Sequence, residues 1–167
     1  MILALDTYYF DDKARTVCFA FENWTDNAPS QTFVDYLEPI SEYEPGSFYK
    51  RELPCILQML QQINMDNVAT VIIDGYVILD NFGKFGLGGY LYQALGQRIS
   101  IVGVAKTNFA ANTLQVRQVI RGKSLNPLFV TAIGLDIDAA ANNIQIMHGD
   151  FRIPTLLKNL DIATKSV

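Results

Sequence analysis

The chain has 167 residues, of which 50% are apolar and 11% aromatic, enough for the core of a single domain over residues 1–167. Its net charge is −4 and only 18% of its residues are charged, a composition that excludes a disordered chain. No apolar stretch is long enough to cross a membrane, so we expect a cytoplasmic protein with no membrane partner.

The charges are distributed unevenly along the chain. Residues 1–52 contain ten acidic and four basic side chains, whereas residues 81–135 contain six basic side chains and no carboxylate. Phosphate binding responds to the local field rather than to the net charge, so the second segment is a candidate contact for nucleic acid. Chance clustering of solvated Lys and Arg explains this pattern equally well when it is taken alone.

Three strands are predicted in the first quarter of the chain. Ile2–Asp6 is an apolar run that ends in an acid, as expected for a buried strand with a functional side chain at its tip. Thr16–Phe21 and Thr32–Leu37 are short, aromatic and β-branched, with a polar turn between them.

An amphipathic helix is predicted over residues 47–64, after the turn signal Tyr43–Gly46. Ser47 is the expected N-cap, because its hydroxyl can accept a hydrogen bond from the first helical turn. Pro54 falls inside this segment and predicts a kink or a shifted start of the helix.

The second half of the chain predicts two further buried strands, Val68–Asp74 and Ile99–Ala105, the second of which delivers Lys106 at its end. A glycine-rich loop and a short helix near residues 87–96 lie between them. The remaining predicted elements are extended segments at Leu114–Arg121 and Leu128–Thr131 and helices at Asp136–Met147 and Arg152–Lys165. This order of strands and helices predicts a ribonuclease H-like α/β fold, with a central mixed sheet flanked by helices.

Four charged residues stand at positions that suit a metal-dependent hydrolase. Asp6 and Asp74 each end an apolar strand, and Glu52 lies on the first predicted helix. Neighbouring strands would bring both tips together, and the helix could place Glu52 over them. Three carboxylates repel one another unless a cation lies among them, and such a site activates water for phosphodiester cleavage. Lys106 could hold a phosphate oxygen or polarise the attacking water. Each acid taken alone is better explained as a turn or cap residue.

The chain contains only two cysteines and one histidine, the residue types that commonly bind zinc. Cys18 and Cys55 lie in apolar surroundings without a CxxC spacing, so we interpret them as buried free thiols. His148 is the only histidine, and a single histidine is more often structural than metal-binding.

Several short motifs resemble the endonuclease V family and occur in family order. Tyr43-x-Pro45-Gly46, with Glu52 nine residues after the tyrosine, resembles the family's YxPG…FRE segment. Asp74-Gly75 resembles its VDG motif. Residues 102–107 (VGVAKT) resemble the family's VGVAK motif, and residues 83–90 (GKFGLGGY) resemble its RGFGxAxH loop. Residues 6–9 resemble its DVxY motif. Residues 126–131 and 151–154 resemble two conserved segments near the family's C-terminus.

The resemblance implies an endonuclease that acts in DNA repair on inosine-containing or otherwise damaged DNA or RNA. It assigns Asp6, Glu52 and Asp74 to Mg²⁺, with Mn²⁺ as an alternative, and Lys106 to the reaction centre. It also implies a nucleic-acid contact in which Tyr43 on its Pro-Gly turn opens the duplex and glycines let the backbone approach a displaced base. The residues of this contact are Tyr43, Pro45, Gly46, Gly75, Gly86 and Gly103.

Two family elements are replaced in this chain. The family has an HxR-type element where this chain has Asp80-Asn81-Phe82, and a Gly-His-Arg element where it has Gly134-Leu135-Asp136. Two histidines and two arginines are therefore lost, and with them expected phosphate contacts. These replacements leave open a second hypothesis: a catalytically impaired module that binds nucleic acid or a protein partner. A third hypothesis is an α/β domain whose acids are only caps.

Overall fold

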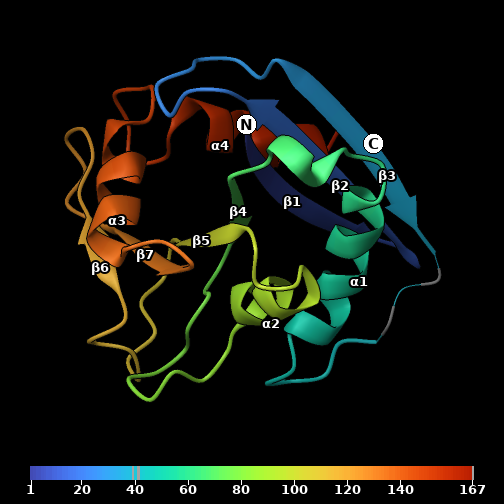
Figure 1. Cartoon of the computed structure of the whole chain (residues 1–167), viewed down its shortest axis with the longest axis horizontal. Helices are drawn as coiled ribbons and strands as arrows, with labels where there is room; N and C mark the ends of the chain where they lie inside the picture. The colour runs from blue at the N-terminus through green and yellow to red at the C-terminus, as the bar shows by residue number, and fades with distance from the viewer. Residues whose placement is uncertain (39, 41, 167) are drawn as a thin grey trace.

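A computed structural model describes residues 1–38, 40 and 42–166, and the strands among them form one sheet (Figure 1). In chain order the strands are β1 (Ile2–Phe10), β2 (Lys13–Phe21), β3 (Gln31–Leu37), β4 (Thr70–Asp74), β5 (Ser100–Ala105), β6 (Arg117–Val119) and β7 (Leu128–Ile133). Across the sheet they lie in the order β3-β2-β1-β4-β5-β7-β6. β1, β4 and β5 are parallel, and the outer strands pair antiparallel.

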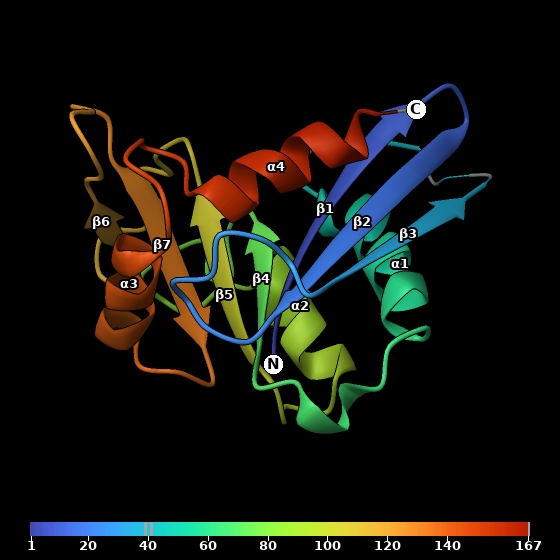
Figure 2. The same cartoon turned by 90° about the horizontal axis from the view of Figure 1, so that it is seen from above.

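Helices cover both faces of the sheet (Figure 2). They are α1 (Tyr49–Leu60), α2 (Leu87–Ala94), α3 (Ile137–Ile146) and α4 (Thr155–Thr164), with a short 3-10 turn at Met65–Asn67. α1 and α2 pack on one face, and α3 and α4 pack on the other. Within the described ranges, no helix combines the length and the apolar character needed to cross a membrane.

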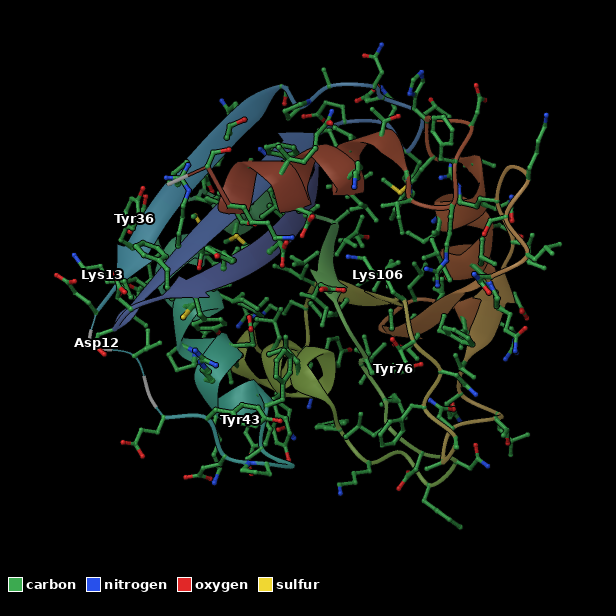
Figure 3. All side chains as sticks on the ribbon, turned by 180° about the vertical axis from the view of Figure 1, so that it is seen from behind. Asp12, Lys13, Tyr36, Tyr43, Tyr76 and Lys106 are labelled. Atoms are coloured by element: carbon green, nitrogen blue, oxygen red, sulfur yellow. The ribbon has the colours of Figure 1, made fainter. Side chains whose placement is uncertain are left out.

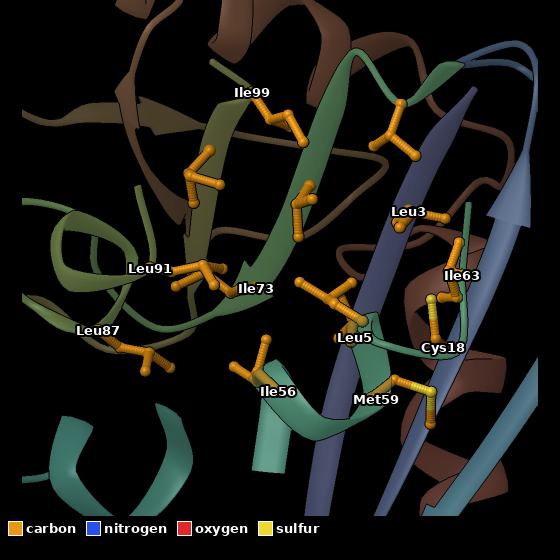
Figure 4. Close-up of a cluster of buried hydrophobic side chains, with 14 of the residues drawn as sticks. Leu3, Leu5, Cys18, Ile56, Met59, Ile63, Ile73, Leu87, Leu91 and Ile99 are labelled. Carbon is orange, nitrogen blue, oxygen red and sulfur yellow. The ribbon is translucent and has the colours of Figure 1, made fainter. Parts of the chain in front are cut away.

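The core is divided into two apolar layers by the sheet. Successive strand residues point to opposite faces, so Leu3 and Ile73 face α1 and α2, whereas Ile2 and Ile72 face α3 and α4. Figure 4 shows the first layer, in which Ile56 and Met59 of α1 and Leu87 and Leu91 of α2 pack against the strands. Cys18 belongs to the same layer, and both cysteines are free and buried, as predicted.

β1 is longer than the sequence predicts. It continues to Phe10 because it forms a hairpin with β2, in which every residue from Ile2 to Phe10 has a partner. The prediction that Asp6 stands at the tip of its strand is therefore wrong. The parallel pairing of β1 with β4 does end at Leu5, however, so Asp6 lies where β1 leaves its inner neighbour.

α1 starts later than the expected residue 47. Phe48 occupies the N-cap position without a side-chain hydrogen bond, so the prediction of Ser47 as the cap is wrong. The Ser47 backbone N–H instead donates to Glu44 O at 3.0 Å and closes the preceding turn. Pro54 lies inside the helix, which starts at Tyr49 rather than at residue 47, in agreement with the alternative of a shifted start.

β7 (Leu128–Ile133) runs past the predicted end at Thr131, whereas the other elements after β5 are shorter than predicted. Only Arg117–Val119 of the expected extended segment forms a strand, because the Asn112 side chain accepts from Gln115 N at 2.9 Å and holds the preceding residues in a turn. α3 begins after Asp136, whose carboxylate accepts from Ala139 N at 3.0 Å as an N-cap. α4 begins only after Pro154.

Candidate active site at the edge of β1 and β4

Asp6 and Asp74 are neighbours at the point where β1 and β4 separate. The parallel pairing of the two strands ends at the residue before each acid. Ala4 and Ile72 belong to the apolar layer under α3 and α4, and the alternation of strand side chains directs Asp6 and Asp74 to that same side. The Asp74 charge is among the causes that raise the pKa of Asp6, as expected for two nearby carboxylates.

Glu52 approaches the two aspartates from α1, on the opposite face of the sheet. It lies on the buried side of the helix with Cys55 and Ile56 and is only 8% exposed. All three acids line one cavity of about 260 Å³, which we call the acid cavity. The tertiary structure thus brings together the three acids that the sequence singles out.

The carboxyl groups of the acid cavity hold their protons more tightly than exposed ones do. Burial, helped by the Asp74 charge, raises the pKa of Asp6 to about 6. Burial also raises the pKa of Glu52 to about 7, and the charges of Asp6 and Asp74 contribute to the rise. Asp74 keeps some contact with solvent, but the surrounding protein atoms partly desolvate its carboxylate. This desolvation raises the pKa of Asp74, and the nearby Lys106 charge opposes the rise. A cation bound here would relieve this cost of ionisation.

The described side chains do not converge on a single point. Among residues 1–38, 40 and 42–166, no group of three or more His, Cys, Asp or Glu side chains is arranged to hold one metal ion. Mg²⁺ commonly keeps several water ligands and takes one or two carboxylates together with substrate phosphates. The acid cavity offers hard carboxylate oxygens from Asp6 and Asp74, with Glu52 beside them. This set of oxygen donors fits that mode of Mg²⁺ binding.

A narrower cavity of about 40 Å³ adjoins the acid cavity on the α4 side, and Asp6 and Asp74 line both. Lys106, directly after β5, lines the narrower cavity, as does Asp161 of α4. The Asp161 carboxylate binds the Lys165 ammonium group, with distances of 2.8 Å to Oδ1 and 3.0 Å to Oδ2. The site therefore has a fourth acid and a second lysine.

Sequence reasoning missed Asp161. The signal for it was weak. Asp161 follows the buried Leu160 directly and the half-buried Leu157 by four residues, so it lies at the edge of the apolar face of its helix. Such positions are usually solvated, and only the packing of α4 over β1 brings this one to the active-site edge.

Arg51 is a second site residue that sequence reasoning did not single out. It lines the acid cavity beside Glu52, and its guanidinium carbon lies 3.7 Å from the centroid of the Tyr9 ring. Stacking on an aromatic face fixes the direction of the guanidinium group while leaving its donors available for an anion. Arg51 is thus placed to bind a phosphate at the acid cavity.

A larger cavity of about 610 Å³, the aromatic cavity, lies beside the acid cavity. Tyr43 and Phe48 line both cavities and form their common wall. Tyr49 and Tyr90 stack with ring centroids 3.8 Å apart. Figure 3 labels Tyr43 and Tyr76, which line this cavity from two different segments, and Lys106 directly after β5. The complete set of aromatic side chains is Tyr43, Phe48, Tyr49, Tyr76, Phe85, Tyr90 and Phe109.

The predicted Pro-Gly turn is present and carries an accessible tyrosine. The Ser47 N–H to Glu44 O bond closes the turn around Pro45 and Gly46, and Gly46 has φ +79°, which glycine adopts without strain. Tyr43 is 56% exposed just before this turn. The geometry is that of an aromatic side chain held at the mouth of the two cavities.

The three predicted glycines differ in their surroundings. Gly75 lines the aromatic cavity, has φ +104°, and has open space where a side chain would be. Gly86 also lines this cavity, but a Cβ there would lie 2.5 Å from Tyr76 O. Gly103 is buried in β5, where a Cβ would lie 2.5 Å from Gly75 O. Close approach of a ligand is therefore available at Gly75, whereas Gly86 and Gly103 accommodate the protein's own chain.

The mixed sheet with helices on both faces and carboxylates at the edge of its central strands defines a ribonuclease H-like protein. The chain belongs to the endonuclease V family, whose sequence model matches residues 1–149. No curated protein matches the chain.

Solved structures of endonuclease V share this fold at low sequence identity. The enzyme from Streptomyces avermitilis is 20% identical, with a TM-score of 0.75, and the match covers 98% of this chain and 79% of that one. Human ENDOV is 20% identical, with a TM-score of 0.74 and coverages of 98% and 82%. Ciona intestinalis endonuclease V, solved in complex with a 24mer DNA containing an inosine followed by a ribo-adenosine, is 16% identical, with a TM-score of 0.82 and coverages of 98% and 84%.

Proposed function

We propose that this chain is a divalent-metal-dependent endonuclease that hydrolyses a phosphodiester bond near an inosine in DNA or RNA. The observation that carries the proposal is the pair of adjoining cavities that share Asp6 and Asp74, with the aromatic cavity directly beside them. Membership of the endonuclease V family supports it, as does the likeness to the Ciona protein solved with inosine-containing DNA.

Asp6 and Asp74 are the residues that would hold the metal, with Glu52 and Asp161 on either side. Mg²⁺ suits this all-oxygen donor set, and Mn²⁺ accepts the same ligands. When bound, a divalent cation supplies an activated water and stabilises the leaving oxygen of the phosphodiester. The positive charge of a bound cation would also let the buried carboxyl groups ionise at neutral pH. Without a cation, the Glu52 carboxyl group is only partly ionised at that pH.

Two cationic side chains are placed to bind the substrate's phosphate groups. Lys106 lies beside Asp6 and Asp74, so its ammonium group can hold a non-bridging oxygen of the scissile phosphate. Arg51 stands at the other side of the acid cavity, where its stacked guanidinium group can bind a neighbouring phosphate. Together they orient the backbone of the nucleic acid across the carboxylates.

The aromatic cavity is the proposed site for a base displaced from its stack. Enzymes that read a single base extrude it and hold it between aromatic side chains and backbone groups. Tyr76 and Tyr49 supply aromatic faces here, and Gly75 allows backbone groups to approach the base edge. Tyr43, exposed on its turn, would fill the gap that the displaced base leaves.

Cleavage of matched oligonucleotides tests this proposal. Strands that differ only by inosine or guanosine at one position are incubated with Mg²⁺, Mn²⁺ or EDTA. We expect metal-dependent cutting of the inosine strand, and a loss of at least about hundredfold in Asp74→Asn. Asp138→Asn, which changes an exposed acid of α3, is the matched control and should retain full activity. Metal-independent cutting, or an Asp74→Asn variant as active as the wild type, would contradict the proposal.

A second candidate function is binding without cleavage. Asp80 and Asp136 replace family histidine and arginine positions, and both act here as structural caps: Asp80 accepts from Phe82 N, and Asp136 accepts from Ala139 N. Neither position supplies a cation for phosphate. This function predicts salt-sensitive binding of oligonucleotides with no turnover in either metal. Metal-dependent turnover of the inosine strand would exclude it.

A further inference from the structure

Phe82 is the most conspicuous apolar side chain on the protein surface, because 97% of it is exposed. It lies at the tip of the loop between β4 and α2, which is ordered by its own hydrogen bonds. The Asp80 carboxylate accepts from Phe82 N at 2.9 Å and from Lys84 N at 3.0 Å. At the base of the loop, Leu79 N donates to Lys84 O at 2.8 Å. The aromatic ring is therefore presented on a closed and well-defined turn.

A second set of bonds fastens this loop to the segment before β6. The Asn81 side chain donates to Thr113 Oγ1 at 2.9 Å and accepts from the backbone N–H groups of Thr113 and Leu114 at 2.8 Å each. Asn112, only 2% exposed, donates to Ile78 O at 2.9 Å. Two segments far apart in sequence are thus tied together at Asn81, the residue before Phe82, which limits the freedom of the loop that carries Phe82.

The loop that carries Phe82 forms one rim of the aromatic cavity. Leu79, Lys84 and Phe85, from the two sides of the loop, line that cavity. Lys84 adds a positive charge two residues from Phe82, and residues 81–135 contain no carboxylate. The Asp80 carboxylate of the same loop is engaged by the backbone N–H groups of Phe82 and Lys84. An exposed ring and a nearby cation match the chemistry of a nucleic-acid strand, with its π-faces and its phosphates.

We propose that Phe82 is a stacking platform for an unpaired base adjacent to the one held in the aromatic cavity. This inference rests on the proposed function, because it places a second base of the same strand. The backbone that carries the ring is already ordered by hydrogen bonds, so little backbone freedom is lost on binding and stacking on the ring gains affinity efficiently. The platform selects an unpaired base, since a base inside a duplex has its faces covered by its neighbours.

The experiment compares three variants of the full chain by fluorescence anisotropy with a labelled, single-stranded, inosine-containing oligonucleotide in EDTA, which prevents cutting. Phe82→Ala should weaken binding by about tenfold or more, the range that one base–aromatic stack supplies. Leu125→Ala is the matched control, because Leu125 is 92% exposed in the turn between β6 and β7. It should bind within about twofold of the wild type. A fully paired version of the oligonucleotide should show a much smaller effect of Phe82→Ala.

Phe82→Trp provides an independent spectroscopic readout. The chain contains one tryptophan, Trp24, whose signal in the wild type serves as the background. Stacking predicts that Phe82→Trp retains affinity and that its added fluorescence is quenched when the oligonucleotide saturates the protein. Thermal melting of all variants establishes that the exposed substitutions leave the fold intact.

The outcomes separate this inference from the proposed function. If the wild type binds the oligonucleotide but Phe82→Ala binds equally well and Phe82→Trp is not quenched, the platform is overturned while the proposed function stands. If the wild type binds no oligonucleotide in EDTA at low salt but cuts the inosine strand with Mg²⁺ or Mn²⁺, the platform alone is overturned. If it neither binds nor cuts, both fail, and a protein partner becomes the better explanation of the exposed ring. Weakened binding by Phe82→Ala, with quenching of Phe82→Trp, supports both.

Discussion

At the scale of single residues, Glu52 shows the cost of bringing acids together in a fold. Its carboxyl group is buried beside Asp6 and Asp74, and burial raises its pKa from an ordinary value of 4.5 to about 7. The unfolded chain does not have this burial. Between about pH 4.5 and pH 7 the folded, metal-free protein therefore binds more protons than the unfolded chain does. Its stability falls as the pH rises through this window and stays low above it.

Glu52→Gln should accordingly stabilise the metal-free protein at pH 8, by up to about 3 kcal/mol, because it removes an ionisation that burial opposes. At pH 4 the same substitution should have little effect, since the carboxyl group is then protonated in the folded state. Urea denaturation in EDTA at both pH values measures the difference, with the exposed Glu38→Gln as the control. A stability change that is the same at both pH values would contradict this account.

At the scale of elements, the position of α4 depends on the segment between α3 and α4. Arg121, two residues after β6, is 3% exposed. Its guanidinium group donates to Phe151 O at 2.7 Å, Met147 O at 2.5 Å and Gly149 O at 2.9 Å. These carbonyl groups belong to the chain that leads into α4. One buried cation thus satisfies several backbone acceptors and holds the helix that carries Asp161.

Arg121→Met should destabilise the protein by about 3 kcal/mol or more, because it leaves buried carbonyl oxygens without donors. Arg117→Met removes a guanidinium group that pairs with Asp138 at the surface and should cost less than about 1 kcal/mol. Thermal melting compares the two, and hydrogen exchange should show faster opening of residues 147–152 in Arg121→Met alone. Equal melting temperatures for the two variants would show that Arg121 is not an anchor.

At the scale of the whole molecule, the charge distribution has to be reconciled with a nucleic-acid substrate. The net charge of −4 opposes general attraction to phosphates. The acids are concentrated in residues 1–52, and several of them belong to the acid cavity or to exposed turns. The cations that we assign to the substrate, Arg51, Lys84 and Lys106, line the cavities themselves. Binding should therefore involve few phosphates and depend on the local site.

This arrangement predicts a modest dependence of binding on salt. Neutralising about three phosphates of a single strand gives a slope near −2 for the logarithm of the association constant against the logarithm of salt concentration. Anisotropy titrations in EDTA between roughly 50 and 200 mM salt measure it. Lys84→Met should make the slope shallower by about one half to one. A slope indistinguishable from zero would indicate that phosphates contribute nothing to binding.

The sequence by itself determined the local features of this protein. The apolar runs that end in Asp74 and before Lys106 predict β4 and β5 closely, because a central strand is buried on both faces and needs no distant information to be recognised. The composition excluded a disordered chain, and the motifs, which occur in the same order as in endonuclease V, identified the family. Tyr43 and its turn followed from the Pro-Gly pair, since that pair favours a tight turn in any context.

Only the tertiary structure decided which residues share a site. Asp161 joins Asp6 because α4 packs across β1, a contact between residues at opposite ends of the chain that no local pattern encodes. The aromatic cavity is assembled in the same way, from the segment before α1, the loop after β4 and the residues after β5. Asp6 stands in mid-strand because β2 extends β1 by pairing with it. Local periodicity reports which residues are buried, whereas the meeting of distant segments depends on how whole helices and strands pack.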